Sequence, residues 1–274
     1  MSKEIHQPDI GILQARAYRQ KFKLTRYQCA RPLESYIKHY WIVHWDLRGE
    51  APHRQFVLSH PNLNMVVEAN NTRVYGIPKI TSSQLLQDEG KVLGVMFRPA
   101  GFYPFWQKPL SELVGKSLTI REAFGVDGGP LEAAILGQED DSAMVELADR
   151  FFLDRLPEPD ENVELVNRMV DTIISNKDIA KVEDAAEKLG VSVRTMQRLF
   201  SRYIGVTPKW VIQRQRLHEA AELIDAGKQT DWVKLSQDLG YYDQAHFIKA
   251  FKAAIGCSPE AYARKSKSKS MPGD

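Results

Sequence analysis

The sequence of 274 residues has few cysteines, no long apolar run and no strong excess of charge. Its two cysteines, Cys29 and Cys257, lie far apart without the close spacing of a metal site, which argues against a disulfide framework and for reduced thiols. Since no stretch of about 18 apolar residues occurs, we expect no membrane span. Residues 1–6 lack the apolar core of a secretory signal. We therefore expect a cytoplasmic protein.

Acidic residues are absent from one stretch, between Ser192 and Arg216. The net charge of +2 gives no sign of a polyanion partner over the whole chain, so charge has to be considered locally. The basic residues of this stretch are Arg194, Arg198, Arg202, Lys209, Arg214 and Arg216. Such a local excess of positive charge is typical of a surface that meets an anion, although a solvated basic face is the alternative.

The same region belongs to a sequence that occurs twice, at residues 189–208 and 239–259. Both copies begin with a Leu-Gly pair, and they close on Gly-Val-Thr-Pro and Gly-Cys-Ser-Pro. The offset is 50 residues at the Leu-Gly pairs and 51 afterwards, so the second copy has one extra residue in its turn. Two copies at a fixed offset indicate two copies of one supersecondary unit.

Each copy carries the signals of a helix, a tight turn and a second helix. Gly190 and Gly240 are typical glycines after a helix end, and Ser192 and Asp243 are typical N-caps. The pattern predicts helices over 193–204 and 244–255, each the second helix of a helix-turn-helix unit. A helix over 208–226 would begin with Pro208 and span about 28 Å, enough to hold two units about one DNA turn apart.

The outward face of each second helix is the predicted DNA contact. Guanidinium and amide side chains on the first turns of an exposed helix can bind guanine and adenine edges in the major groove. The predicted DNA-binding residues are Arg194, Thr195, Gln197, Arg198 and Arg202 in the first unit and Gln244, His246 and Lys249 in the second. The second face is less basic, so we expect weaker or more permissive base recognition there.

The N-terminal half has a different pattern. Short β-branched and aromatic runs at 40–45, 56–58, 65–67, 73–75 and 91–98, separated by turn residues, predict a sandwich or barrel. Helical spacing follows at 110–113, 131–136 and 143–156, and a Pro- and acid-rich segment at 157–161 indicates a domain boundary. We predict an α+β protein with a β-rich sensor and dimerisation domain (1–157), a DNA-binding domain (158–265) and a basic disordered tail (266–274).

Two features of the N-terminal half admit alternatives. The apolar stripe of Met144, Leu147, Phe151 and Leu156 fits either a dimerisation helix or simple packing on the barrel. His39, His44, His53 and His60 could bind a metal inside a barrel, or they are isolated histidines. A metal-dependent barrel enzyme or a pure protein-interaction module fused to the DNA-binding domain are therefore alternative functions of this half.

Aromatic residues beside positive charge would suit a planar or anionic ligand inside a barrel. We predict Trp41, Arg98 and Tyr103 as effector-binding residues. The alternative is that the aromatic side chains only close the core of the barrel.

Residues 185–190, Arg198-Leu199-Phe200 and Thr207-Pro208 resemble the AraC-type (AraC/XylS) bacterial regulators, as do residues 239–247 and 256–262. The likeness covers about 161–264 and implies a seven-helix domain in which a long helix joins two helix-turn-helix units. It places Arg194, Gln197 and Arg198, and then Gln244, His246 and Lys249, in the groove. One departure is Lys249, where the family often has Arg, which weakens the expectation of a bidentate guanine contact.

Residues 97–113 resemble a sensor-type domain that precedes this DNA-binding domain, which in the wider family is a cupin-like barrel followed by helices that dimerise. The resemblance implies a sequence-specific, non-enzymatic transcriptional regulator, an activator or a repressor, with no cofactor or metal. Its expected partners are the major groove of double-stranded DNA, a small-molecule effector, RNA polymerase and a second copy of the chain. It is expected at the bacterial nucleoid when bound to DNA.

Overall fold

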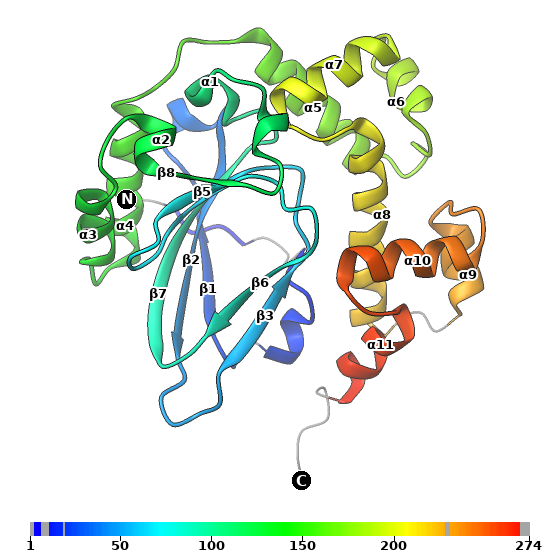
Figure 1. The fold of residues 1–274 in the computed structure, drawn as a ribbon, viewed down its shortest axis with the longest axis horizontal. Coiled ribbons are helices and arrows are strands. Elements are labelled where there is room, and N and C mark those ends of the chain that lie inside the picture. Colours follow the sequence, from blue (N-terminus) through cyan, green and yellow to red (C-terminus); the bar gives the residue numbers. More distant parts are fainter. Residues whose placement is uncertain (1–2, 7–10, 19, 228–230, 269–274) are drawn as a thin grey trace.

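The computed structural model describes residues 3–6, 11–18, 20–227 and 231–268. It has a β-rich N-terminal part and a helical C-terminal part, which confirms the predicted two-domain α+β class (Figure 1). The strands are β1 (Lys23–Tyr27), β2 (Ile37–Asp46), β3 (His53–Val57), β4 (Asn64–Val67), β5 (Arg73–Tyr75), β6 (Ser82–Leu86), β7 (Glu89–Phe97) and β8 (Ser117–Thr119).

The strands form two antiparallel sheets rather than one closed barrel. Six strands are ordered β1-β2-β7-β4-β5-β8, and β3 pairs with β6 in a separate sheet of two strands. Successive side chains of a strand point to opposite faces of the sheet, and the two faces of the large sheet have different environments. Tyr40, Ile42, Leu93 and Val95 are completely buried on one face. The other face lines a cavity of about 820 Å³ that also touches β3 and β6.

Short helices cover the fully buried face of the large sheet. They are α1 (Tyr103–Trp106), α2 (Ile120–Phe124), α3 (Gly129–Leu136) and α4 (Asp141–Leu153), with the 3-10 helices η2 (Arg31–Leu33) and η3 (Leu110–Leu113). The 3-10 helix η1 (Ala15–Tyr18) lies instead beside β3, where the ring of Tyr18 contacts that of His53 with centroids 4.2 Å apart. Met144 and Phe151 of the predicted dimerisation stripe are buried within the chain. These two residues therefore pack on the sheet, as the alternative interpretation of the stripe expected.

The described residues of the C-terminal part form helices and no strands. They are α5 (Glu161–Ser175), α6 (Val182–Lys188), α7 (Val193–Tyr203), α8 (Pro208–Asp225), α9 (Trp232–Asp238), α10 (Gln244–Ile255) and α11 (Pro259–Ser268). Figure 1 shows α8 between the sheet domain on one side and α9 and α10 on the other, with α5, α6 and α7 at its upper end. No described helix has the length and apolar character needed to cross a membrane.

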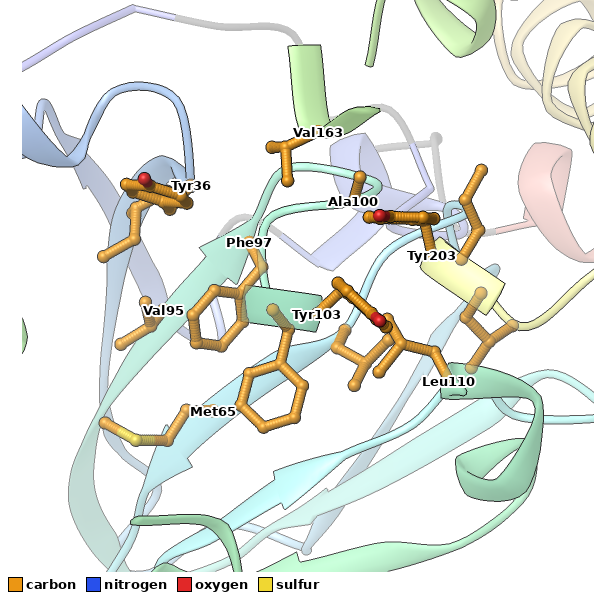
Figure 2. Packing of buried hydrophobic residues seen from close by; sticks show 14 of the residues in the cluster. Tyr36, Met65, Val95, Phe97, Ala100, Tyr103, Leu110, Val163 and Tyr203 are labelled. Atoms are coloured by element: carbon orange, nitrogen blue, oxygen red, sulfur yellow. The ribbon is translucent and has the colours of Figure 1, made fainter. Parts of the chain in front are cut away.

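The hydrophobic core does not stop at the predicted boundary between residues 157 and 158. One continuous cluster contains Phe97 and Tyr103 of the N-terminal part together with Val163 of α5 and Tyr203 of α7 (Figure 2). The rings of Tyr103 and Tyr203 lie 4.1 Å apart between centroids. The first helix-turn-helix unit is thus packed directly on the sheet domain, and the domain limits remain a prediction.

A second, smaller core attaches the other end of α8. It combines Leu217 of α8 and Phe247 of α10 with Leu13 and Leu58 of the N-terminal part. In addition, the hydroxyl of Thr81 donates a hydrogen bond to the carbonyl oxygen of Ala254. Both ends of the C-terminal part therefore contact the sheet domain.

The predicted disordered tail begins too early. Helix α11 continues to Ser268, and Ser266 is buried with its hydroxyl donating to Asp225 Oδ1 at 2.8 Å. The charged sequence suggested a solvated end, but the serine side chain faces the end of α8. Residues 269–274, the rest of the predicted tail, lie outside the described residues.

Candidate nucleic-acid interface

Helix α7 begins at the capping signal that the sequence contains. Gly190, with φ of +64°, follows α6, and the hydroxyl of Ser192 accepts a hydrogen bond from Thr195 N at 3.1 Å. One face of α7 is buried, and it consists of Met196, Leu199, Phe200 and Tyr203. The opposite face is therefore fixed by the helical period and cannot rotate away from the surface.

Three of the predicted DNA-binding residues lie together on that exposed face. Arg194, Gln197 and Arg198 are all exposed. Among the described residues none of their side chains has a hydrogen-bond or ion-pair partner. Thr195 is half-buried, and its hydroxyl lies 2.8 Å from Ser192 Oγ, where it supports the cap. The helix thus presents two guanidinium groups and one amide that are available to a ligand.

Arg202, which we also predicted to contact DNA, has a different environment. Its Nε donates a hydrogen bond to the hydroxyl of Tyr103 at 2.5 Å, and this bond raises the pKa of the guanidinium. The guanidinium also lies 5.2 Å from the centre of the Tyr103 ring. Arg202 is exposed, as helical spacing predicted, but it lies at the end of α7 that contacts the sheet domain. In this structure Arg202 joins α7 to the N-terminal part through Tyr103.

The remaining basic residues of the stretch, Lys209, Arg214 and Arg216, also differ in their environments. Lys209 is exposed, whereas Arg214 is buried over the ring of Trp210, 4.5 Å from its centre. Burial lowers the pKa of Arg214 to about 10. Arg216 donates hydrogen bonds to the carbonyl oxygens of Gly240 and Ala180 at 3.2 and 3.0 Å. Arg214 is therefore buried inside the helical domain, where its Nη1 has no partner among the described residues, and Arg216 links the two units.

Helix α10 repeats the design of α7 in the second unit. The carboxylate of Asp243 accepts from His246 N at 2.7 Å, which caps the helix. His246 and Lys249 are exposed, and Gln244 is half-buried. The ring of His246 stands edge-on to Tyr241 with centroids 5.4 Å apart, so its orientation is supported by a buried aromatic residue. This face carries one permanent positive charge, at Lys249, where α7 carries two.

An exposed aromatic residue that was not among the predicted DNA-binding residues lies beside α10. Tyr242 is 93% exposed, while its neighbour Tyr241 is 7% exposed. Tyr241 occupies the buried position that Val191 approaches in the first unit, so Tyr242 is the extra residue of the second turn. The change in offset from 50 to 51 residues was the signal that could have identified it.

Helix α8 fixes the separation of the two units. Thr207 caps it by accepting a hydrogen bond from Trp210 N at 3.1 Å, and Pro208 is its first residue. Its 18 residues correspond to a rod of about 27 Å. The bonds from Arg216 to both units make the connection stiffer than a single helix would be.

The three predicted effector-binding residues do not share one site. Trp41 lines the cavity beside the large sheet. Arg98, in contrast, pairs with Asp171 of α5 at 3.2 Å, and Tyr103 is buried against Tyr203. Both follow the end of β7, where the chain turns toward the helices on the other face of the sheet. The prediction for Arg98 and Tyr103 is therefore corrected, and they are domain-contact residues.

The histidines of the N-terminal half are also separated. They are His39, His44, His53 and His60. His44 lies 2.7 Å from Asp141 Oδ1, and His60 stacks on His218 of α8 with centroids 4.3 Å apart. Within the described ranges, no group of three or more His, Cys, Asp or Glu side chains is arranged to hold a metal ion.

Two family models match the chain. Residues 185–265 match a helix-turn-helix domain, and residues 25–119 match a domain of unknown function (DUF6597). The first range covers α7 to α10 and so includes both units. The second range covers the large sheet, and its description assigns no activity.

Curated relatives are similar over the C-terminal part. An uncharacterized HTH-type transcriptional regulator of Haemophilus influenzae is 34% identical over 85 residues, which are 31% of this chain and 28% of that protein. The regulatory protein PocR of Salmonella typhimurium is 28% identical over 121 residues, 43% of this chain and 38% of that protein. The virulence regulon transcriptional activator VirF of Yersinia enterocolitica is 28% identical over 79 residues, 29% of each chain. The chain thus spans about a third of the length of these relatives.

Solved structures of similar proteins include the C-terminal domain of AraT, a response regulator from Geobacillus stearothermophilus. It is 28% identical and covers 39% of this chain and 88% of that chain, with a TM-score of 0.35. ToxT from Vibrio cholerae is 12% identical and covers 89% of this chain and 98% of that chain, with a TM-score of 0.37. At these TM-scores we draw no inference from either likeness. The matched sequence and the geometry of α6 to α10 together show that residues 185–265 are a helix-turn-helix domain of the AraC type.

Proposed function

We propose that the protein is a transcriptional regulator that binds a specific sequence of double-stranded DNA in the major groove through α7 and α10. The observation that carries this proposal is the exposed group of Arg194, Gln197 and Arg198 on the first two turns of α7. These side chains have no partner among the described residues, and guanidinium and amide groups are the donors that bind base edges. The apolar face of α7 is buried, so the helix keeps these side chains on its solvent-facing side.

The two units are proposed to contribute unequally. Arg194, Gln197 and Arg198 make α7 the main determinant of sequence specificity. Gln244, His246 and Lys249 on α10 offer fewer bidentate groups, since the lysine ammonium acts as a point charge. Tyr242, which is 93% exposed just before α10, is proposed to contact the sugar-phosphate backbone.

The N-terminal domain is proposed to control DNA binding in response to a signal. Support comes from its contacts with both helix-turn-helix units, through Tyr103 and Tyr203 of α7 and through Thr81 and Ala254 of α10. A change in the sheet domain would then alter how the two units sit on DNA. A small-molecule effector, RNA polymerase and a second copy of the chain are the partners that we propose, with the bacterial nucleoid as the location of the bound protein.

The test is DNA binding by the Arg198→Ala variant. The bound sequence is first selected from a random duplex library with the full-length wild-type protein. Affinity for that duplex and for a scrambled duplex is then measured at several salt concentrations. We expect Arg198→Ala to weaken specific binding by about 1–3 kcal/mol and to relax specificity at one base position.

The matched control is Arg168→Ala. Arg168 is an exposed arginine of α5 that pairs with Glu164 at 3.5 Å, so this variant removes the same charge away from α7 and α10. We expect its specific affinity to stay near that of the wild type. Equal affinities of Arg198→Ala and the wild type for the selected duplex would refute the assignment of α7 to the groove.

A further inference from the structure

The cavity beside the large sheet has an unusual floor, formed by two tryptophans paired with two glycines. Trp41 of β2 lies directly across from Gly94 of β7, and Trp45 lies across from Gly90. A Cβ atom on Gly94 would be 1.8 Å from Trp41 Cε2, and one on Gly90 would be 2.3 Å from Trp45 Cζ2. The indole rings therefore rest on the backbone of β7, in the space that side chains would fill.

Hydrogen bonds hold both indoles in this position. Trp41 Nε1 donates to Asn64 Oδ1 of β4 at 3.4 Å, and Trp45 Nε1 donates to the carbonyl oxygen of Gln87 at 3.0 Å. The ring of Trp41 thus reaches across β7 to the next strand. Trp41 and Trp45 both line the cavity, so the cavity has a rigid aromatic surface.

One end of this floor has two buried polar atoms without a partner among the described residues. A shift of register in β2 between Ile37 and His39 brings both Lys38 and His39 to the cavity. His39 is 4% exposed, and its Nδ1 has no hydrogen-bond partner among the described residues. The hydroxyl oxygen of Ser59, another lining residue, is also buried and without a partner in the same part of the chain.

The charges around this end are positive. Burial, together with the nearby positive charges of Arg26 and Lys38, lowers the pKa of His39 to about 3, so the ring is neutral at pH 7 and can donate one hydrogen bond. Around the cavity, the described lysine and arginine side chains are Arg26, Lys38, Lys79 and Lys116, and the one described carboxylate is that of Glu68. Unpaired donors beside cations at a buried end are the surroundings that an anionic group requires.

We propose that this cavity binds a planar aromatic carboxylate. Its ring packs against the face of the Trp41 indole, between apolar side chains that include Leu24, Val43 and Val66. Its carboxylate accepts hydrogen bonds from His39 Nδ1–H and the hydroxyl of Ser59, in the field of the neighbouring lysine and arginine side chains. A flat ring can stack on the rigid indole surface. On binding it loses less conformational entropy than a flexible chain would lose.

The same polar end is connected to the DNA-binding domain. Ser59 and His60 both line the cavity, and both contact His218 of α8. The carbonyl oxygen of Ser59 accepts from His218 Nε2 at 3.2 Å, and the rings of His60 and His218 are stacked with an interplanar angle of 9°. A ligand bound to Ser59 therefore acts on the segment that supports α8, and this regulatory step rests on the proposed function.

The first experiment compares three probes on full-length wild-type protein without DNA. Tryptophan fluorescence and calorimetry follow the binding of 2-naphthoate, of its neutral analogue 2-naphthamide and of the flexible anion decanoate. We expect 2-naphthoate to bind and to quench fluorescence, with each other probe weaker by about tenfold or more, the loss that follows from one missing charged hydrogen bond or from an ordered chain. No binding of 2-naphthoate at millimolar concentration, or equal or tighter binding of either other probe, overturns the proposal.

Variants locate the site. Trp41→Leu and His39→Leu should each weaken 2-naphthoate binding by about tenfold. Trp106→Leu is the matched control, because Trp106 belongs to α1 and does not line the cavity. Unchanged affinity in a folded Trp41→Leu protein places the ligand elsewhere and refutes the proposal. The probe series on the wild type decides the question where a variant does not fold.

A last measurement separates this proposal from the proposed function. Affinity for the selected duplex is determined with and without saturating 2-naphthoate, and we expect a change of about fivefold or more, which corresponds to a coupling energy of about 1 kcal/mol. Ligand binding without any duplex binding would contradict the function and leave the site intact. Duplex binding that 2-naphthoate does not change refutes the coupling through Ser59 and His60.

Discussion

At the scale of single residues, two buried tyrosine hydroxyls of the helical domain differ in their hydrogen bonds. Tyr262 is 3% exposed, and its hydroxyl donates to Asp225 Oδ2 at 2.9 Å and accepts from Gln14 N at 3.2 Å. Tyr241 is 7% exposed, and its hydroxyl has no partner in the described part of the chain. A buried polar group without a partner costs about 1–3 kcal/mol, so removal of the two hydroxyls should have opposite effects.

We expect Tyr262→Phe to lower the free energy of unfolding by about 1–3 kcal/mol, because Asp225 and Gln14 N lose a buried partner. Tyr241→Phe should leave this free energy unchanged or raise it by up to about 1 kcal/mol, since it removes an unsatisfied hydroxyl and keeps the ring. Urea denaturation of both variants gives the comparison. Similar losses in both variants would mean that the hydroxyl of Tyr241 has a partner.

At the scale of helices, the sequence predicted the C-terminal elements closely. Helix α10 has the predicted bounds, and α7 and α8 each end one residue before the predicted end. Their limits depend on Ser192, Thr207 and Asp243, whose side chains cap the helix that follows each of them. These signals act within three residues along the chain, so a single sequence contains the information that sets them.

Strands and domain contacts were predicted less well, because their partners are distant in the sequence. β1, β6 and β8 were missed; β6, for example, is a largely polar run that forms only by pairing with β3. Arg202 was assigned to DNA because helical spacing places it outside, and no local signal shows that Tyr103 lies 99 residues away in contact with it. The same limit explains why Arg98 was placed with Trp41.

The packing of α7 on η3 leads to a prediction about two glycines. Gly205 and Gly256 follow α7 and α10 with φ of +97° and +91°, so alanine costs similar backbone strain, about 1–2 kcal/mol, at both positions. A Cβ on Gly205 would lie 2.6 Å from the carbonyl oxygen of Leu110, whereas nothing lies within 4 Å of one on Gly256. We expect Gly205→Ala to lower the free energy of unfolding by about 1–3 kcal/mol more than Gly256→Ala. Equal losses in urea denaturation would show that α7 and η3 separate at little cost.

At the scale of the whole molecule, the two parts are joined by buried polar groups as well as by apolar packing. Asn167 of α5 is 4% exposed, its Oδ1 accepts from Ala100 N at 3.0 Å, and its Nδ2 donates to the carbonyl oxygen of Ser35 at 3.2 Å. Val163 and Tyr203 belong to the same core as Phe97. Separation of the domains would expose this apolar surface and leave backbone groups of the sheet domain without partners, so the full-length protein should unfold as one unit.

The last prediction concerns this unity and uses Asn167→Ala. The variant leaves Ala100 N and the Ser35 carbonyl without a partner, so we expect the free energy of unfolding to fall by about 2–4 kcal/mol. Tryptophan fluorescence and far-ultraviolet circular dichroism should give the same urea midpoint in the wild type and again, at lower urea, in the variant. Asn162→Ala is the control, because the side chain of this exposed asparagine of α5 bonds, within the described ranges, only to Asp160, so the variant should shift the midpoint little. Two separate transitions in the wild type would show instead that the helical domain unfolds independently of the sheet, and the shared core would then contribute little to the contact through which a signal reaches α7.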